Sequence, residues 1–74
     1  KLRFEFMSPV SVNARIELYD MAGRLVKIIF EQEIEGGVVY DAEFIPESEI
    51  SGIYVYRITL GKHITNGKAI FKKQ

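Results

Sequence analysis

Apolar and polar residues alternate with a period of two along most of this 74-residue chain, which is the pattern of β-strands rather than of helices. The alternation is clear over residues 2–6, 14–18 and 38–44. Residues 25–30 form a denser apolar run, which predicts a strand covered on both faces. Residues 53–60 combine β-branched and aromatic side chains, so they make the strongest strand prediction.

Turn and break signals separate these segments. They fall at Met7-Ser8-Pro9, the acidic range 31–35 with Gly36-Gly37, the range 45–51, Gly61-Lys62 and Asn66-Gly67. Gly61-Lys62 suits a two-residue hairpin, and Asn66-Gly67 predicts a bulge or bend before a final segment at 68–73. The range 45–51 predicts a loop, with a single helical turn at 47–50 as the alternative, because Pro46 suits a helix start.

Six or seven short strands, with turn signals about every eight to twelve residues, predict an all-β chain folded as an antiparallel sandwich. At 74 residues it makes a single domain, 1–74, and it has no cysteine to reinforce a small core. Ten basic residues balance ten acidic ones, so we expect no nucleic-acid partner. No apolar stretch approaches the roughly 20 residues of a membrane span. Lys1 is not a methionine, so we expect a fragment of a larger protein.

The stretch YDMAGRLVKIIF at 19–30 places an acidic residue, a glycine and an arginine between two apolar runs. A three-residue hairpin loop built on a type I turn needs a residue with positive φ, and Gly23 takes that position without steric cost. Asp20, at the first position of the turn, can accept hydrogen bonds from backbone N–H groups two or three residues on. The turn does not require Arg24, which either pairs with Asp20 or a chain-terminal carboxylate or contacts a partner.

The other polar residues do not form a recognisable catalytic or metal-binding set. His63 is the only histidine, whereas a metal site needs three or four converging ligands. The serines have no evident base partner, and paired glutamates such as Glu31 and Glu33 are expected to be solvated charge. Most of the tyrosines fall on strand faces predicted to be buried, so we expect them in the core rather than in a sugar-binding platform. We therefore expect no enzyme activity and no cofactor.

The C-terminal segment carries Lys68, Lys72 and Lys73. Lysines on a terminal strand commonly protect an exposed sheet edge from pairing with other chains. If that is their role, any self-association of this chain is expected to be weak. The alternative is that these lysines contact a receptor, and it comes from a family resemblance.

Four segments in order resemble the C-terminal sorting domain of the bacterial type IX secretion system. LRFEFMSP at 2–9 is similar to its first strand and proline turn, and VSVNARIELYDMAGRLVKII at 10–29 is similar to its strand, Tyr-Asp, Gly-Arg, strand signature. SGIYVYRITLG at 51–61 resembles its Gly-apolar-Tyr strand. TNGKAIFKKQ at 65–74 resembles its closing lysine-rich segment, which ends the cargo protein in that family.

The resemblance implies a seven-stranded immunoglobulin-like sandwich attached behind a secreted enzyme or adhesin of a Bacteroidetes-type bacterium. The cargo would reach the periplasm through a signal peptide. This domain would then direct it through the type IX translocon across the outer membrane to the cell surface or beyond, where a sortase typically removes the domain and joins the cargo to an anionic lipopolysaccharide. The positions that match family motifs are Asp20, Gly23, Arg24, Gly52, Tyr54, Gly67, Lys68 and Lys72.

The terminal Lys72, Lys73 and Gln74 would offer charge and an α-carboxylate to a receptor. We therefore expect the translocon to read Arg24, Lys68 and these three residues, whereas Asp20, Gly23, Gly52, Tyr54 and Gly67 belong to the structural motif. The Asn-Pro element that commonly precedes the first strand in the family is absent here.

Two other readings stay open. The immunoglobulin-like domain of the flagellar hook-capping protein has a related pattern, but its usual Trp-Asp-Gly element is replaced here by Val39-Tyr40-Asp41-Ala42. The chain could also be an accessory sandwich that spaces a secreted enzyme or binds glycan. The sorting-domain pattern fits more of the sequence than either.

Overall fold

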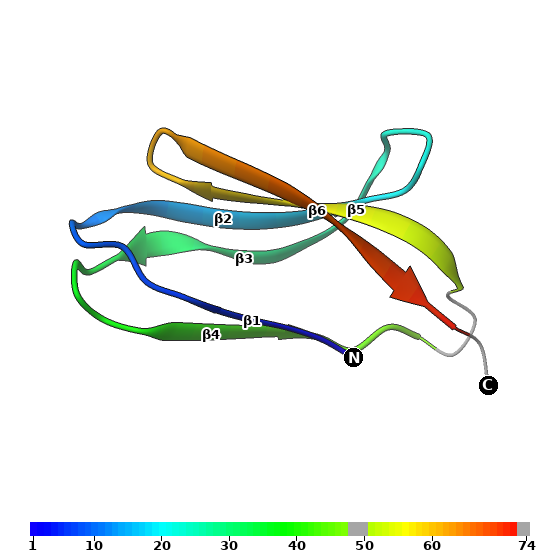
Figure 1. The fold of residues 1–74 in the computed structure, drawn as a ribbon, viewed down its shortest axis with the longest axis horizontal. Coiled ribbons are helices and arrows are strands. Elements are labelled where there is room, and N and C mark those ends of the chain that lie inside the picture. Colours follow the sequence, from blue (N-terminus) through cyan, green and yellow to red (C-terminus); the bar gives the residue numbers. More distant parts are fainter. Residues whose placement is uncertain (48–50, 73–74) are drawn as a thin grey trace.

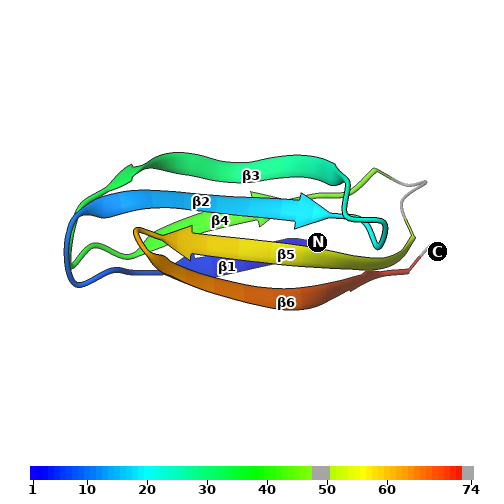
Figure 2. The same ribbon diagram turned by 90° about the horizontal axis from the view of Figure 1, so that it is seen from above.

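The computed structural model describes residues 1–47 and 51–72, and these form six β-strands and no helix (Figure 1). The strands are β1 (Leu2–Phe6), β2 (Val12–Tyr19), β3 (Leu25–Ile34), β4 (Tyr40–Phe44), β5 (Gly52–Leu60) and β6 (His63–Phe71). All strand pairs are antiparallel. One sheet pairs β1 with β4, and the other has the order β3-β2-β5-β6. The sheets stack as two layers, which confirms the predicted sandwich (Figures 1 and 2).

The strand order is that of an immunoglobulin-like sandwich. In that fold strands B and E are neighbours in one sheet and strands C′, C, F and G follow one another in the other. Here β1 and β4 take the B and E positions, and β3, β2, β5 and β6 take the C′, C, F and G positions. The positions of strands A and D, which flank B and E, are filled by no strand among residues 1–47 and 51–72.

The core lies between the sheets and comes from the alternating residues of the first strands. Ile16 and Leu18 of β2 are completely buried, and Phe4 of β1 and Ala42 of β4 cover Ile16 from the other sheet. The Phe4 ring meets the Tyr56 ring edge to face at 5.1 Å. Fully burying one such aliphatic or aromatic side chain contributes about 1.5–3 kcal/mol, so a small set of residues carries most of the stability of this domain.

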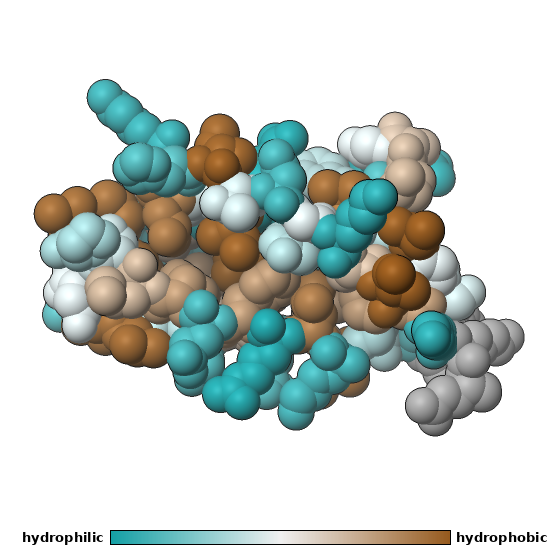
Figure 3. Space-filling view, in the orientation of Figure 1, coloured by the Kyte–Doolittle hydropathy of each residue, from teal (hydrophilic) through white to brown (hydrophobic). Residues whose placement is uncertain are grey.

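The outer face of the two-stranded sheet is charged. Lys1 lies 3.5 Å from Glu43, and Arg3 donates to Asp41 at 3.1 Å. Figure 3 shows the resulting hydrophilic side chains along the lower edge of the view, where β1 and β4 run. The alternation of residues 2–6 therefore separates a core face from a solvated face, as the sequence pattern predicts.

Strand β3 is longer and more exposed than its sequence predicts. The expectation that residues 25–30 are covered on both faces is wrong, because β3 is an edge strand and Leu25 is 48% exposed. Two irregularities in the pairing of β3 with β2 also change which side chains face inward. The strand continues through the acidic range and ends at Ile34. Within this range, the Glu31 carboxylate lies 2.6 Å from the Arg15 guanidinium on the solvated face.

The bulge or bend predicted at Asn66-Gly67 is also wrong. β6 pairs with β5 in one unbroken register from His63 to Phe71, with the predicted hairpin turn at Gly61-Lys62 before it. Gly67 lies opposite Tyr56, and a β-carbon at position 67 would overlap the phenol ring. The glycine therefore makes room for an aromatic ring rather than for a change of backbone direction.

Two further boundaries differ from expectation. The strand predicted from residue 38 begins at Tyr40, and Val38 and Val39 are exposed in the connection before it. Most of the alternative helical turn at 47–50 lies outside the described residues, as do Lys73 and Gln74.

Candidate functional site

The corner at 20–24 joins β2 to β3 by the predicted three-residue loop. The Asp20 carbonyl accepts a hydrogen bond from the Gly23 N–H at 3.0 Å, and the Asp20 N–H donates to the Arg24 carbonyl at 3.0 Å. Gly23 has a φ of +86°, a conformation that costs side-chain-bearing residues energy. The sequence-based prediction of a type I turn followed by glycine is therefore confirmed.

The Asp20 carboxylate holds the corner together from outside the backbone. It accepts hydrogen bonds from the Ala22 N–H at 3.0 Å and from the Arg24 N–H at 2.9 Å, and Arg24 Nε donates to its second oxygen at 3.0 Å. The Arg24 N–H bond, with the other donors, lowers the pKa of Asp20. The carboxylate at the start of the loop thus binds its middle and its end.

Arg24 forms the local pair that the sequence left as one of two alternatives, yet its side chain is 82% exposed. Its guanidinium carries five N–H donors, and Nε alone is engaged by Asp20. The pair directs the side chain toward Asp20, and most of the guanidinium stays exposed to solvent. Guanidinium donors of this kind can bind a carboxylate or a phosphate.

A shallow hollow of about 260 Å³ lies beside the corner on the outer face of the four-stranded sheet. Its lining residues are Tyr19, Asp20, Met21, Gly23, Val55, Arg57 and Asn66. The Arg57 guanidinium lies over the Tyr19 ring at 5.3 Å, and Arg57 Nε donates to the Asn66 side-chain oxygen at 3.3 Å. This arrangement places a second oriented arginine on the same face as the corner.

Tyr19 connects this hollow to a buried carboxylate. Its hydroxyl donates to Glu17 at 2.6 Å, and this bond, together with burial, raises the pKa of Tyr19. Glu17 is buried, and Arg15 Nε lies 3.1 Å from it without the geometry of a hydrogen bond. The Tyr19 hydroxyl, the Glu17 carboxylate and the Arg15 guanidinium thus lie in sequence along the outer face of the sheet.

The terminal strand β6 carries a lysine on the same sheet face as the hollow beside the corner. Tyr19 of β2 pairs with Val55 of β5, and Val55 pairs with Lys68 of β6, so the three side chains form a row across the sheet. Lys72 follows β6 and is exposed. Figure 2 shows the corner and the end of β6 at the same end of the sheet. Of the residues predicted to contact a receptor, the described ones, Arg24, Lys68 and Lys72, therefore lie at one end of the molecule.

The other matched motif positions have structural roles. Tyr54 packs its ring against Phe71 at 5.4 Å and belongs to the core cluster around Leu18. Gly52 pairs with Phe71 at the start of β5, and Gly67 accommodates Tyr56. The tyrosines of β4 and β5 were predicted to be buried, and they are half-buried: Tyr54 and Tyr56 pack against the core clusters, and Tyr40 stacks on Phe6.

Arg57 and Asn66 were not predicted from sequence as part of this face. Their relation depends on the register between β5 and β6, which single-strand patterns do not contain. The available signal was Arg57 itself, since it is the one charged residue within the otherwise apolar and hydroxyl-bearing range 53–60.

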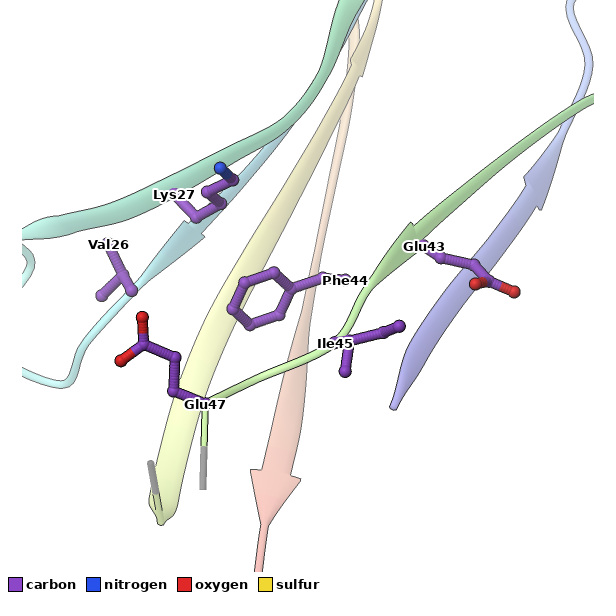
Figure 4. Close-up of a pocket in the computed structure, with 6 residues that line it drawn as sticks. All are labelled: Val26, Lys27, Glu43, Phe44, Ile45 and Glu47. Atoms are coloured by element: carbon purple, nitrogen blue, oxygen red, sulfur yellow. The ribbon is translucent and has the colours of Figure 1, made fainter. Parts of the chain in front are cut away.

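A larger hollow of about 630 Å³ lies between β3 and β4. Val26 and Lys27 line it from β3, Glu43 and Phe44 from β4, and Ile45 and Glu47 from the segment that follows (Figure 4). Figure 4 shows the Phe44 ring directed between the strands, whereas the Glu43 carboxylate points away from Lys27. The hollow lies on the open side of the sandwich, and its charged groups do not converge on one point.

Within residues 1–47 and 51–72, no group of three or more His, Cys, Asp or Glu side chains is placed to hold a metal ion. No helix is present there that is long and apolar enough to cross a membrane. His63 lies exposed at the start of β6, next to the hairpin turn.

Comparison with protein-family models, curated proteins and solved structures gives no match to this chain.

Proposed function

We propose that this chain is a non-catalytic C-terminal sorting domain that directs an attached cargo protein across the outer membrane through a type IX secretion system. The observation that carries the proposal is the grouping of Arg24, Lys68 and Lys72 at one end of the sandwich. Arg24 lies in the corner, Lys68 on the outer face of the four-stranded sheet, and Lys72 just after β6. These are positions at which the sequence resembles the sorting-domain motifs. The translocon and the surface sortase are the proposed partners, with the periplasm and then the cell surface as the locations.

A folded export signal must present its information on the surface, because its backbone and core are already engaged. The corner meets this requirement, since the Asp20 pair orients Arg24 while leaving it exposed. Arg57 adds a second oriented guanidinium beside the hollow. A receptor carrying carboxylates would find the oriented guanidiniums of Arg24 and Arg57 near two exposed lysines, which favours selective recognition over general charge attraction.

The test is export of a periplasmic reporter fused ahead of this domain in a bacterium with a working type IX system. We expect the Arg24→Gln variant and the removal of residues 72–74 each to lower the exported fraction roughly tenfold or more. Shortening a side chain at the centre of an interface commonly lowers affinity by this much. Arg24→Lys keeps the charge but loses the planar donor array, so we expect an intermediate result.

Lys62 provides the matched control, because it lies in the hairpin at the opposite end of the sandwich. Lys62→Gln removes the same charge as Lys68→Gln, and we expect export to fall only for the latter. The variant domains must also unfold at the temperature of the parent, since exposed pairs contribute little to stability. Equal export of the parent, Arg24→Gln and truncated fusions would exclude this surface as the signal.

A further inference from the structure

The two-stranded sheet has an open edge along β1. This strand pairs with β4 on one side, and among the described residues its other side has no strand partner. Figure 2 shows β1 behind β5 and β6 and β4 behind β2 and β5, so the free edge of β1 faces outward on the β6 side of the sandwich. Such an edge presents unpaired backbone N–H and C=O groups that another strand can bind.

The sequence of β1 is complementary to itself in antiparallel orientation. Its residues are Leu-Arg-Phe-Glu-Phe, with apolar side chains toward the core and Arg3 and Glu5 on the solvated face. When two such strands run antiparallel with Phe4 opposite Phe4, Arg3 of each copy faces Glu5 of the other. Opposite charges directly across a strand pair stabilise it, and the two-fold symmetry provides this contact twice.

Glu5 forms no ion pair within its own sheet. Its direct cross-strand partner is Asp41, another carboxylate, and Arg3 reaches diagonally to that same Asp41 at 3.1 Å. No ion pair involves Glu5 within residues 1–47 and 51–72. A second copy would therefore bring an arginine directly opposite a carboxylate that has Asp41 across the strand pair and forms no ion pair among the described residues.

The other open edges do not have this property. Along β4, antiparallel self-pairing about Ala42 would place Asp41 opposite Glu43, which is repulsive. Along β3, two irregularities interrupt the ladder, and Glu31 and Glu33 lie near one end. Along β6, self-pairing about Gly67 would set Lys68 opposite Asn66, so no charge is compensated.

We propose that two copies of this chain associate through antiparallel pairing of their β1 edges, which joins their two-stranded sheets into one sheet of order β4-β1-β1-β4. The interface contains a single short strand from each copy, so we expect a weak dimer, with a dissociation constant of about 0.1–1 mM. The pairing uses the two-stranded sheet, whereas the corner at 20–24 and the outer face of the other sheet stay open. The dimer does not depend on the proposed export function.

The decisive variant is Glu5→Arg. It sets Arg3 against an arginine of the second copy at both symmetric contacts, and it also removes the like-charge contact between residue 5 and Asp41. We therefore expect the single chain to fold at least as well as the parent, while the dissociation constant rises about tenfold, measured by sedimentation equilibrium at low salt. The double variant Arg3→Glu with Glu5→Arg restores opposite charges across the interface, and we expect it to recover the dimer.

Glu33→Arg is the matched control, because it makes the same change in net charge on an exposed residue of β3. We expect it to leave the dissociation constant within about twofold of the parent, because residue 33 lies far from the proposed interface. Amide hydrogen exchange at high and low protein concentration identifies the pairing strand, and the added protection should fall within β1. A chain that stays monomeric at millimolar concentration, a dimer unaffected by Glu5→Arg, or protection confined to β3 or β6 would each overturn the proposal.

Discussion

Gly67 and Tyr56 face each other across β6 and β5, and the phenol ring occupies the space in which a side chain at position 67 would begin. We expect Gly67→Ala to displace the ring from its contact with Phe4 and to lower the free energy of unfolding by about 1–3 kcal/mol, as overpacking does. Denaturant unfolding measures this loss. In a background with Tyr56→Leu the same glycine substitution should cost much less, and an equal cost in both backgrounds would contradict this explanation.

At the corner, the hydrogen bonds to Asp20 predict a dependence on acidic pH. The folded-state pKa of Asp20 lies below its unfolded value because the Arg24 N–H and the other donors favour the carboxylate. Its contribution is therefore present above the unfolded pKa of about 3.9 and is lost as the pH falls through the lower folded value. We expect Asp20→Asn to lower the melting temperature at pH 7.

As the pH falls below about 4, the melting temperatures of the parent and of Asp20→Asn should converge. Protonation of Asp20 removes its negative charge, which the asparagine of the variant lacks at every pH. Thermal unfolding followed by circular dichroism from pH 7 to pH 2 tests this directly. Arg24→Gln serves as the companion variant, because it removes the side-chain pair and keeps the backbone donors. A difference between parent and Asp20→Asn that is unchanged at pH 2 would contradict the assignment.

Among the elements, those whose pattern is local were predictable from sequence. The alternation in β1 and β2 identifies the core face, and every hydrogen bond that closes the corner at 20–24 lies within five consecutive residues. The position of β3 was not predictable, because an edge location depends on which strands pair with β2 and β5. A dense apolar run is equally compatible with a central strand and with an exposed edge strand. In an edge strand, bulges can change which side chains point toward the core.

The same distinction applies to the candidate site. Arg24 stands next to Asp20 in the turn, so turn chemistry was sufficient to direct attention to it. The Arg57–Asn66 contact arises only when β5 and β6 pair in the observed register. The bulge predicted at Gly67 was wrong for the same reason, because the glycine makes room for the Tyr56 ring on the neighbouring strand.

The edge position of β3 predicts different costs for the same substitution within one strand. Ile34 is 1% exposed, and we expect Ile34→Ala to lower the free energy of unfolding by about 2–5 kcal/mol. Ile28 is 37% exposed, so Ile28→Ala should cost less than about 1 kcal/mol. Denaturant unfolding of both variants gives the comparison. Equal large losses would mean that β3 is covered on both faces after all.

For the whole molecule, the small size of the domain implies that its two sheets unfold together. A two-stranded sheet is at best marginally stable alone, so β1 and β4 depend on the contact of Phe4 and Ala42 with Ile16. A domain of 74 residues is expected to be stable by about 4–11 kcal/mol in total. Phe4→Ala leaves a cavity at this contact and should cost about 3–5 kcal/mol, which is a large part of that total.

We expect Phe4→Ala to shift a single cooperative transition rather than to release the two-stranded sheet from an intact four-stranded one. Resolved NMR signals of Tyr40 in β4 and Tyr54 in β5 report separately on the two sheets during urea unfolding. Because the shared core is the main stabilising contact of β1 and β4, both signals should show the same midpoint in the parent and the same lower midpoint in the variant. A midpoint for Tyr40 that falls while that of Tyr54 is unchanged would show that the four-stranded sheet folds by itself and that β1 and β4 only dock onto it.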